Sequence, residues 1–140
     1  MRRPRQTAAV LAVLAVLALC ASALAACGGS SKPSYCSSVS SLESSIKALP
    51  STNVVQTGLN GLETAVTKVQ SNAQTAINDA KSDFPTETSA LKSSVDTLSA
   101  TVKQAASSPS PATLVQLPAQ ISAVVTAANN FQSATKSKCS

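Results

Sequence analysis

The sequence contains no histidine and no tryptophan, and only one tyrosine and two phenylalanines among its 140 residues. Without histidine the chain lacks the usual general base near neutral pH and the commonest metal ligand. Charged residues make up only 12% of the chain, and nucleic-acid-binding surfaces need clustered basic residues together with stacking rings or base-reading arginines. We therefore expect a protein that is not an enzyme, binds no cofactor or metal and has no nucleic-acid partner.

The scarcity of rings also limits the core. The hydrophobic fraction of 44% consists mostly of Ala, Val and Leu, and such side chains each bury less area than an aromatic ring. A chain of this length predicts one domain. We expect something other than packing to help stabilise it.

What the chain does have, first, is an N-terminal segment with the anatomy of an export signal. Arg2, Arg3 and Arg5 supply a positive start, residues 8–19 are apolar, and small residues stand directly before Cys27. An alternative is an uncleaved anchor, because residues 8–26 carry no charge and approach the roughly 20 residues that span a bilayer.

The residues Leu24-Ala25-Ala26-Cys27, followed by Gly-Gly-Ser-Ser, resemble a bacterial lipobox. The resemblance implies cleavage between Ala26 and Cys27 and attachment of acyl chains to the Cys27 thiol. Cys20 fits less well because bulky Leu19 precedes it. The predicted organisation is a signal peptide over residues 1–26, a lipidated Cys and flexible tether over residues 27–34, and a folded domain over residues 35–140. The predicted location is the extracytoplasmic face of the cell membrane.

Cleavage would change the charge and cysteine counts. The three arginines lie in the signal, so eight lysines remain against six acidic residues, a formal charge of +2 instead of +5. With Cys20 removed and Cys27 acylated, Cys36 and Cys139 can form only one bridge. Such a bridge persists in exported proteins and closes a loop of about 100 residues. A redox-active pair or a metal site is the weaker alternative, because no Cys-x-x-Cys is present.

Apolar residues recur at alternating spacings of three and four, which is the period of a helix face. Four such series follow one another: Val39, Leu42, Ile46, Leu49; then Val55, Leu59, Leu62, Val66, Val69, Ala73, Ala76, Ala80; then Leu91, Val95, Leu98, Val102, Ala105; and finally Leu114, Leu117, Ile121, Val124, Ala128, Phe131. The second series extends over more than three heptads and is typical of coiled-coil packing. No sustained period-two alternation predicts a strand.

Breaks between the series are marked by proline. Pro50 ends the first series, with Ser51 or Thr52 able to cap the next, and Pro85 suits a first helical turn. Ser110 can cap the last helix with Pro111 at its first position. Within the helices, we expect Gly58 and Gly61 to fray the second. We expect Pro118 to kink the fourth or delay its start.

These elements predict an all-α fold, an antiparallel up-down bundle of four helices with a short first helix. Because the chain runs along the bundle four times in alternating directions, the start of the first helix and the end of the fourth lie at the same end of the bundle. A bridge between Cys36 and Cys139 requires the same arrangement. Residues 50–54 would run extended to compensate for the short first helix.

Two smaller clusters remain. Asp79, Asp83 and Glu87 surround the second corner, and we interpret them as capping and solvated residues in preference to a divalent cation site. The three rings, Tyr35, Phe84 and Phe131, are expected to fill the ends of the bundle. The alternative for these rings is a pocket lined by Ala and Val between the helices.

The lipobox, the domain start Tyr35-Cys36-Ser37, the Ala/Ser/Thr/Val-rich heptads and the terminal Lys138-Cys139 together resemble the small alanine-rich lipoproteins of actinobacteria. The resemblance implies location and helical shape and carries over no catalytic residue. We hypothesise a lipid-anchored, non-enzymatic helical module that serves an envelope protein partner. The alternative is a carrier or sensor of a lipid or small apolar ligand bound between helices.

Overall fold

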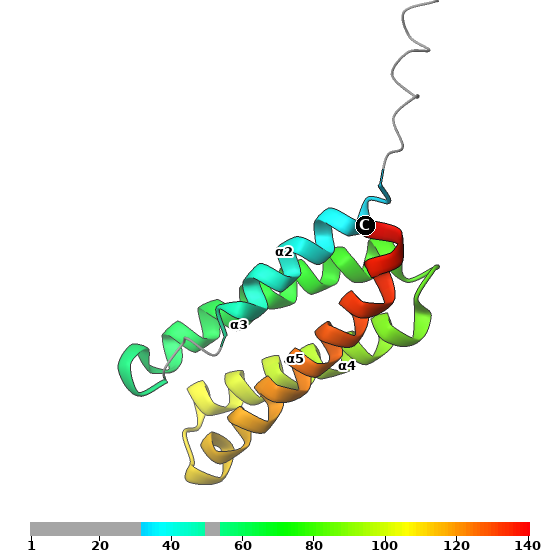
Figure 1. Ribbon diagram of the computed structural model, residues 1–140. Helices are drawn as coiled ribbons and strands as arrows, with labels where there is room; N and C mark the ends of the chain where they lie inside the picture. Colours follow the sequence, from blue (N-terminus) through cyan, green and yellow to red (C-terminus); the bar gives the residue numbers. More distant parts are fainter. Residues whose placement is uncertain (1–31, 50–53) are drawn as a thin grey trace, which may run out of the picture. The chain divides into compact units, whose positions relative to one another are not determined.

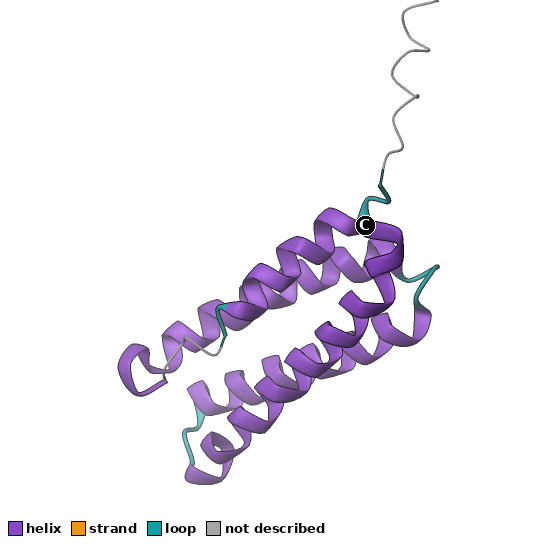
Figure 2. Cartoon of the chain, in the orientation of Figure 1, coloured by secondary structure: helices purple, strands orange, loops and turns teal. Residues whose placement is uncertain are grey.

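The computed structural model describes residues 32–49 and 54–140. In these residues the chain forms four α-helices and no strand: α2 (Tyr35–Lys47), α3 (Val54–Ala80), α4 (Pro85–Ser107) and α5 (Pro111–Cys139) (Figures 1 and 2). Around the bundle α2 lies beside α3 and α5, and α4 lies beside α3 and α5. The all-α, up-down fold predicted from the sequence is confirmed. Lys32–Ser140 forms one compact unit with its own core, so we expect it to fold without the preceding residues.

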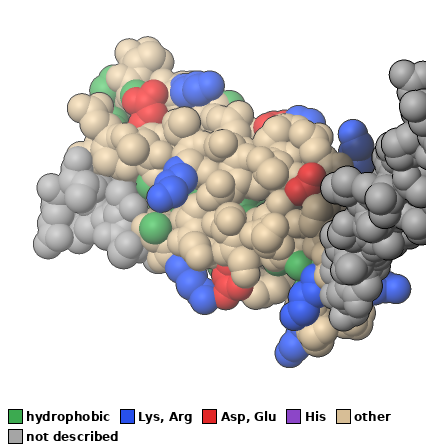
Figure 3. Space-filling model, turned by 90° about the horizontal axis from the view of Figure 1, so that it is seen from above, with side chains coloured by type: hydrophobic (Ala, Val, Ile, Leu, Met, Phe, Trp, Pro, Cys, Tyr) green, Lys and Arg blue, Asp and Glu red, His purple; other side chains and the backbone are tan. Residues whose placement is uncertain are grey.

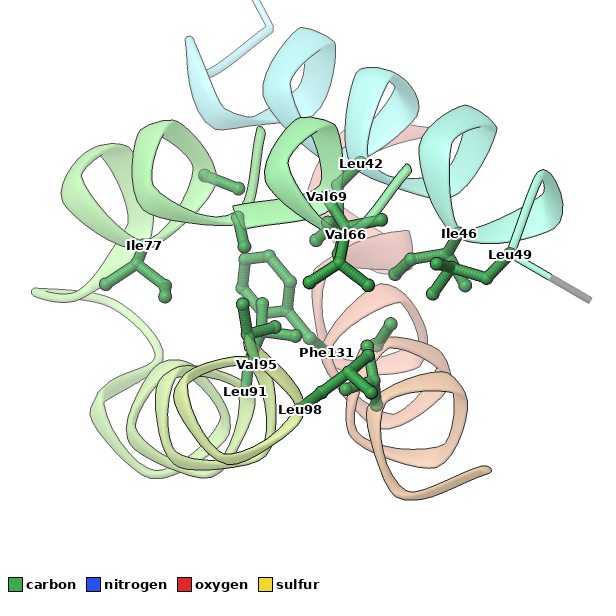
Figure 4. Close-up of a cluster of buried hydrophobic side chains, with 14 of the residues drawn as sticks. Leu42, Ile46, Leu49, Val66, Val69, Ile77, Leu91, Val95, Leu98 and Phe131 are labelled. Atoms are coloured by element: carbon green, nitrogen blue, oxygen red, sulfur yellow. The ribbon is translucent and has the colours of Figure 1, made fainter. Parts of the chain in front are cut away.

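The interior is built from the predicted apolar series. The members of the first and third series are all buried, as are those of the second from Leu62 onward. Figure 4 shows side chains of all four helices directed toward one another, with Phe131 of α5 among them. The length of the helices compensates for the small size of the side chains, because α3, α4 and α5 contribute seven, five and four buried hydrophobic residues to one continuous core.

Gly58 breaks the first turns of α3. Its φ of 70° and ψ of 177° are not helical, and positive φ is a conformation that glycine adopts without the steric penalty of a side chain. The predicted fraying in this helix is therefore localised at Gly58, whereas Gly61 lies within the helix. The proposed caps at Ser51 or Thr52 lie outside the described residues, as do residues 50–53 of the segment 50–54 that was predicted to be extended. Val54, the last residue of that segment, already belongs to α3.

The starts of α4 and α5 follow the predicted chemistry. Pro85 occupies the first turn of α4. At α5 the Ser110 side chain accepts a hydrogen bond from the Thr113 backbone N–H at 3.2 Å, and Pro111 is in the first turn. The predicted delayed start at Pro118 is wrong, because α5 begins at Pro111 and runs through this proline.

The lengths of α2 and α5 differ by more than a factor of two, with 13 and 29 residues. The disulfide fixes their ends together, so α2 reaches only as far along α5 as the level of Val125 and Ala128. The first turns of α5 extend beyond the described end of α2. This explains why Leu114, predicted as an interior position, is 38% exposed and Val115 is 77% exposed.

Candidate functional site: the disulfide pole and the groove between α2 and α5

The predicted disulfide is present. Cys36, in the first turn of α2, and Cys139, at the end of α5, are bonded across a sequence separation of 103 residues. We call this end of the bundle the disulfide pole. Ala26 and Cys27, the predicted cleavage and lipidation site, lie outside the described residues, as does Cys20.

Three lysines surround the end of α5 at this pole. Lys136 and Lys138 lie in its last turn, and Lys32 Nζ donates a hydrogen bond to the Cys139 carbonyl at 2.9 Å. Cations at a helix C-terminus are favoured by the partial negative charge of its free carbonyl groups. The lysines therefore complement the end of α5.

The three aromatic rings gather behind the disulfide. The rings of Tyr35 and Phe84 meet edge to face with centroids 5.6 Å apart, and Phe84 meets Phe131 in the same way at 6.3 Å. Such edge-to-face pairs add to the stabilisation that burial provides. The rings were expected to fill the ends of the bundle; instead all three contact one another at the same end, with Tyr35 and Phe131 buried.

Acidic residues at this pole serve the helix packing. The Ser38 hydroxyl donates a hydrogen bond to Asp79 Oδ2 at 2.6 Å, which joins α2 to α3.

Burial, and secondarily the negative charge of Asp83, raises the pKa of the Tyr35 phenol above its usual 10.0. Among the residues that the structure describes, no three His, Cys, Asp or Glu side chains are grouped so as to hold a metal ion.

A groove lies between α2 and α5; the sequence left a pocket between helices open as an alternative but did not indicate between which helices it would lie. The groove consists of two adjoining cavities that share Val39, Glu43 and Gln132 as walls. Gln132 Nε2 donates a hydrogen bond to Glu43 Oε2 across the groove at 2.6 Å. The two residues are 89 positions apart, so no sequence motif could have paired them.

On the face of the molecule seen from above, no large area of the surface is uniformly hydrophobic, basic or acidic. Acidic and basic side chains are interspersed there, and hydrophobic side chains appear as small separate areas (Figure 3). None of the described helices combines the length and the apolar character that crossing a bilayer requires.

Comparisons with protein-family models, with curated proteins and with solved structures found no match for this chain.

Proposed function

We propose that the protein is exported, is anchored to the membrane through acyl chains on Cys27, and presents its helical bundle as a non-enzymatic interaction or accessory module for an envelope protein partner. The sequence from Arg2 to Cys27 supports the anchor. The observation that carries the proposal is the closure of the bundle at the disulfide pole, where the predicted tether joins the domain. An anchor at Cys27 would therefore hold the domain by one end.

This geometry suits a module that must reach a partner. Of the predicted tether 27–34, residues 27–31 precede the compact unit and would span at most about 17 Å at roughly 3.3 Å per residue. The 29 residues of α5 then place the far end of the bundle about 43 Å beyond the disulfide pole, at roughly 1.5 Å per residue. The far end, with exposed Leu114 and Val115, would thus be the part of the module that can reach farthest from the anchor.

The disulfide would also protect the module against the pull of its own anchor. A force applied through the tether enters the domain at Lys32–Ser34, and the bridge lies at the second residue of α2. The bridge passes that force to α5. The short α2 is therefore not peeled from the bundle when the tether is under tension.

The anchor is tested by mass spectrometry and membrane fractionation of wild type and of two cysteine variants. The wild-type protein should start at a diacylglycerylated Cys27 and remain with membranes. The Cys27→Ala variant should lose the lipid and its processing at this site. Cys20→Ala is the matched control and should behave as wild type; lipid that persists in Cys27→Ala would contradict the assignment.

The module itself is tested by site-specific photocrosslinking in intact cells. A photoreactive residue at Val115, on the far end, should give a discrete protein adduct. The matched position is Ser137, exposed at the disulfide pole, which should give weaker or lipid-derived adducts. If neither position gave a protein adduct in cells where the anchor is intact, the interaction role would be refuted.

A further inference from the structure

The groove between α2 and α5 has two parts of different chemistry. Its narrow part, the slot, has a volume of about 260 Å³. Its apolar walls are Val39, Leu42 and Ile46 of α2 and Val125 and Ala128 of α5, and its polar lining is Glu43, Lys47, Asn129 and Gln132. Its wide part, the vestibule, has a volume of about 690 Å³ and opens beside the disulfide. Val39, Glu43 and Gln132 line both parts, so the slot and the vestibule adjoin each other.

The slot has the dimensions of a single hydrocarbon chain. From Val39 to Ile46 it follows two helical turns, about 10 Å at 1.5 Å per residue, so its volume corresponds to a mean cross-section of roughly 25 Å². Carbon atoms in contact are 3.5–4.0 Å apart, so one file of methylenes needs a channel of about 20 Å². A partner helix, about 10 Å across, does not fit.

The vestibule is polar and carries cations that are not neutralised within the site. Lys32 and Lys136 border it together with the hydroxyls of Ser40 and Ser133. Lys32 uses one of its three donors on the Cys139 carbonyl. Within residues 32–49 and 54–140, Lys136 forms no ion pair. Lys136 is therefore the cation to test.

The acidic residue at the junction is already engaged. Glu43 pairs with Lys47 one turn away and accepts the hydrogen bond from Gln132. It therefore does not neutralise Lys136. Its bond to Gln132 joins α2 to α5 where the slot and the vestibule adjoin.

We propose that the α2–α5 groove binds one alkyl chain of an anionic amphiphile, with the chain in the slot and the head group in the vestibule against Lys136 and Lys32. Charge complementarity selects the head group, and the width of the slot selects a single chain. The proposal does not depend on the membrane anchor, since it concerns only residues of the unit Lys32–Ser140.

The site predicts how affinity changes with chain length and charge. Each methylene that enters the slot should tighten binding about fourfold, and the gain should stop once the slot is full. An anionic head group should bind about fivefold more tightly than an uncharged one of the same chain, because a single lysine near an anionic group contributes about that much.

The test is calorimetric titration of the unit Lys32–Ser140 with alkyl phosphates carrying hexyl to dodecyl chains, each below its micellar concentration. Alkyl glucosides of the same lengths are the uncharged comparison. We expect saturable binding of one alkyl phosphate per protein. Its affinity should rise about fourfold with each added methylene and become constant once the slot is full. Absence of saturable binding, or affinity independent of chain length, would overturn the proposal.

Two pairs of variants separate the parts of the site. Lys136→Gln should weaken alkyl phosphate binding about fivefold and leave alkyl glucosides unchanged, whereas Lys103→Gln, at an exposed position of α4, should change neither. Ala128→Leu fills the slot and should abolish binding of both probes, whereas Ala100→Leu, also exposed on α4, should not. Equal effects of a variant and its control would refute the assigned site.

A measurement on the wild-type protein guards against a folding defect in Ala128→Leu. Intermolecular nuclear Overhauser effects should join the chain protons of decyl phosphate to the methyl groups of Ile46 and Val125. Contacts confined to other methyl groups, such as those of Leu114 and Val115, would exclude the slot. If the groove did not bind an amphiphile, the photocrosslinking and lipidation results would not change. The groove proposal and the proposed function can therefore be refuted independently of each other.

Discussion

Removal of the disulfide should cost this protein a large part of its stability. Cys36 and Cys139 close a loop with a sequence separation of 103. In the chain-entropy model such a loop restricts the unfolded chain by about 16 cal/mol/K, which corresponds to about 4.7 kcal/mol at 25 °C. Domains of this size have total free energies of unfolding of about 5–15 kcal/mol. The double variant Cys36→Ser/Cys139→Ser should therefore fold only marginally.

The assay is urea unfolding of the unit Lys32–Ser140, followed by circular dichroism, for wild type and for the double variant. We expect the free energy of unfolding to fall by about 4 kcal/mol, since strain and residual structure reduce the ideal value. Wild type in reductant should match the variant, and reductant should not change the variant. A loss below about 1 kcal/mol would refute the reasoning.

A second measurement tests the mechanism. The entropy argument places the effect in the unfolded state, so the folded helices should keep their relative protection against amide hydrogen exchange. If α2 alone lost protection in the double variant while α3, α4 and α5 kept theirs, the bridge would act by holding α2 in place. The magnitude would then reflect local detachment of 13 residues and not restriction of the unfolded chain.

Three further predictions concern single positions. Gly58→Ala should lower the free energy of unfolding by about 1–3 kcal/mol in urea titrations, because the φ of 70° at this position is unfavourable for a residue with a Cβ. A steric clash is not the cause, since nothing lies within 4 Å of an added Cβ. The control is Asn60→Ala, on the exposed helix surface, which should cost less than about 0.5 kcal/mol. Phe131→Ala removes a ring that is fully buried and should cost about 3–5 kcal/mol in the same assay, with Phe131→Leu costing less. The pKa of Tyr35 is raised in the folded protein, so its contribution to stability is fully present below the unfolded-state pKa of 10.0 and is lost as the pH rises through the folded-state pKa. In that alkaline range wild type should lose more stability than Tyr35→Phe, and parallel pH profiles of stability for the two proteins would contradict this.

Sequence periodicity predicted the helices well because their signals are local. Interior positions such as Leu62 and Leu98 were recognisable from spacing alone, since one helix face must be apolar wherever the helix packs. Proline and serine marked the starts at Pro85 and Pro111 because their effects on the backbone act within one turn. The bridge followed from elimination among four cysteines together with an even number of helices.

Other features depended on distances that a local pattern does not contain. Gly58 adopts positive φ, but two nearby glycines had equal claim to the break in the helix. Leu114 continued the apolar spacing, yet it is exposed because α2 ends before reaching it. Pro118 was expected either to kink α5 or to delay its start, yet the helix begins at Pro111 and runs through Pro118.

The sequence by itself thus determined the helical fold, the order of its elements, their apolar faces and the pairing of Cys36 with Cys139. Only the tertiary structure decided how α2 and α5, which are far apart in the chain, face each other. Their separation depends on the lengths of the helices, on the volumes of the core side chains and on the bond from Gln132 to Glu43. Periodicity indicates which face of a helix is buried, whereas a groove arises only where two such faces fail to close completely.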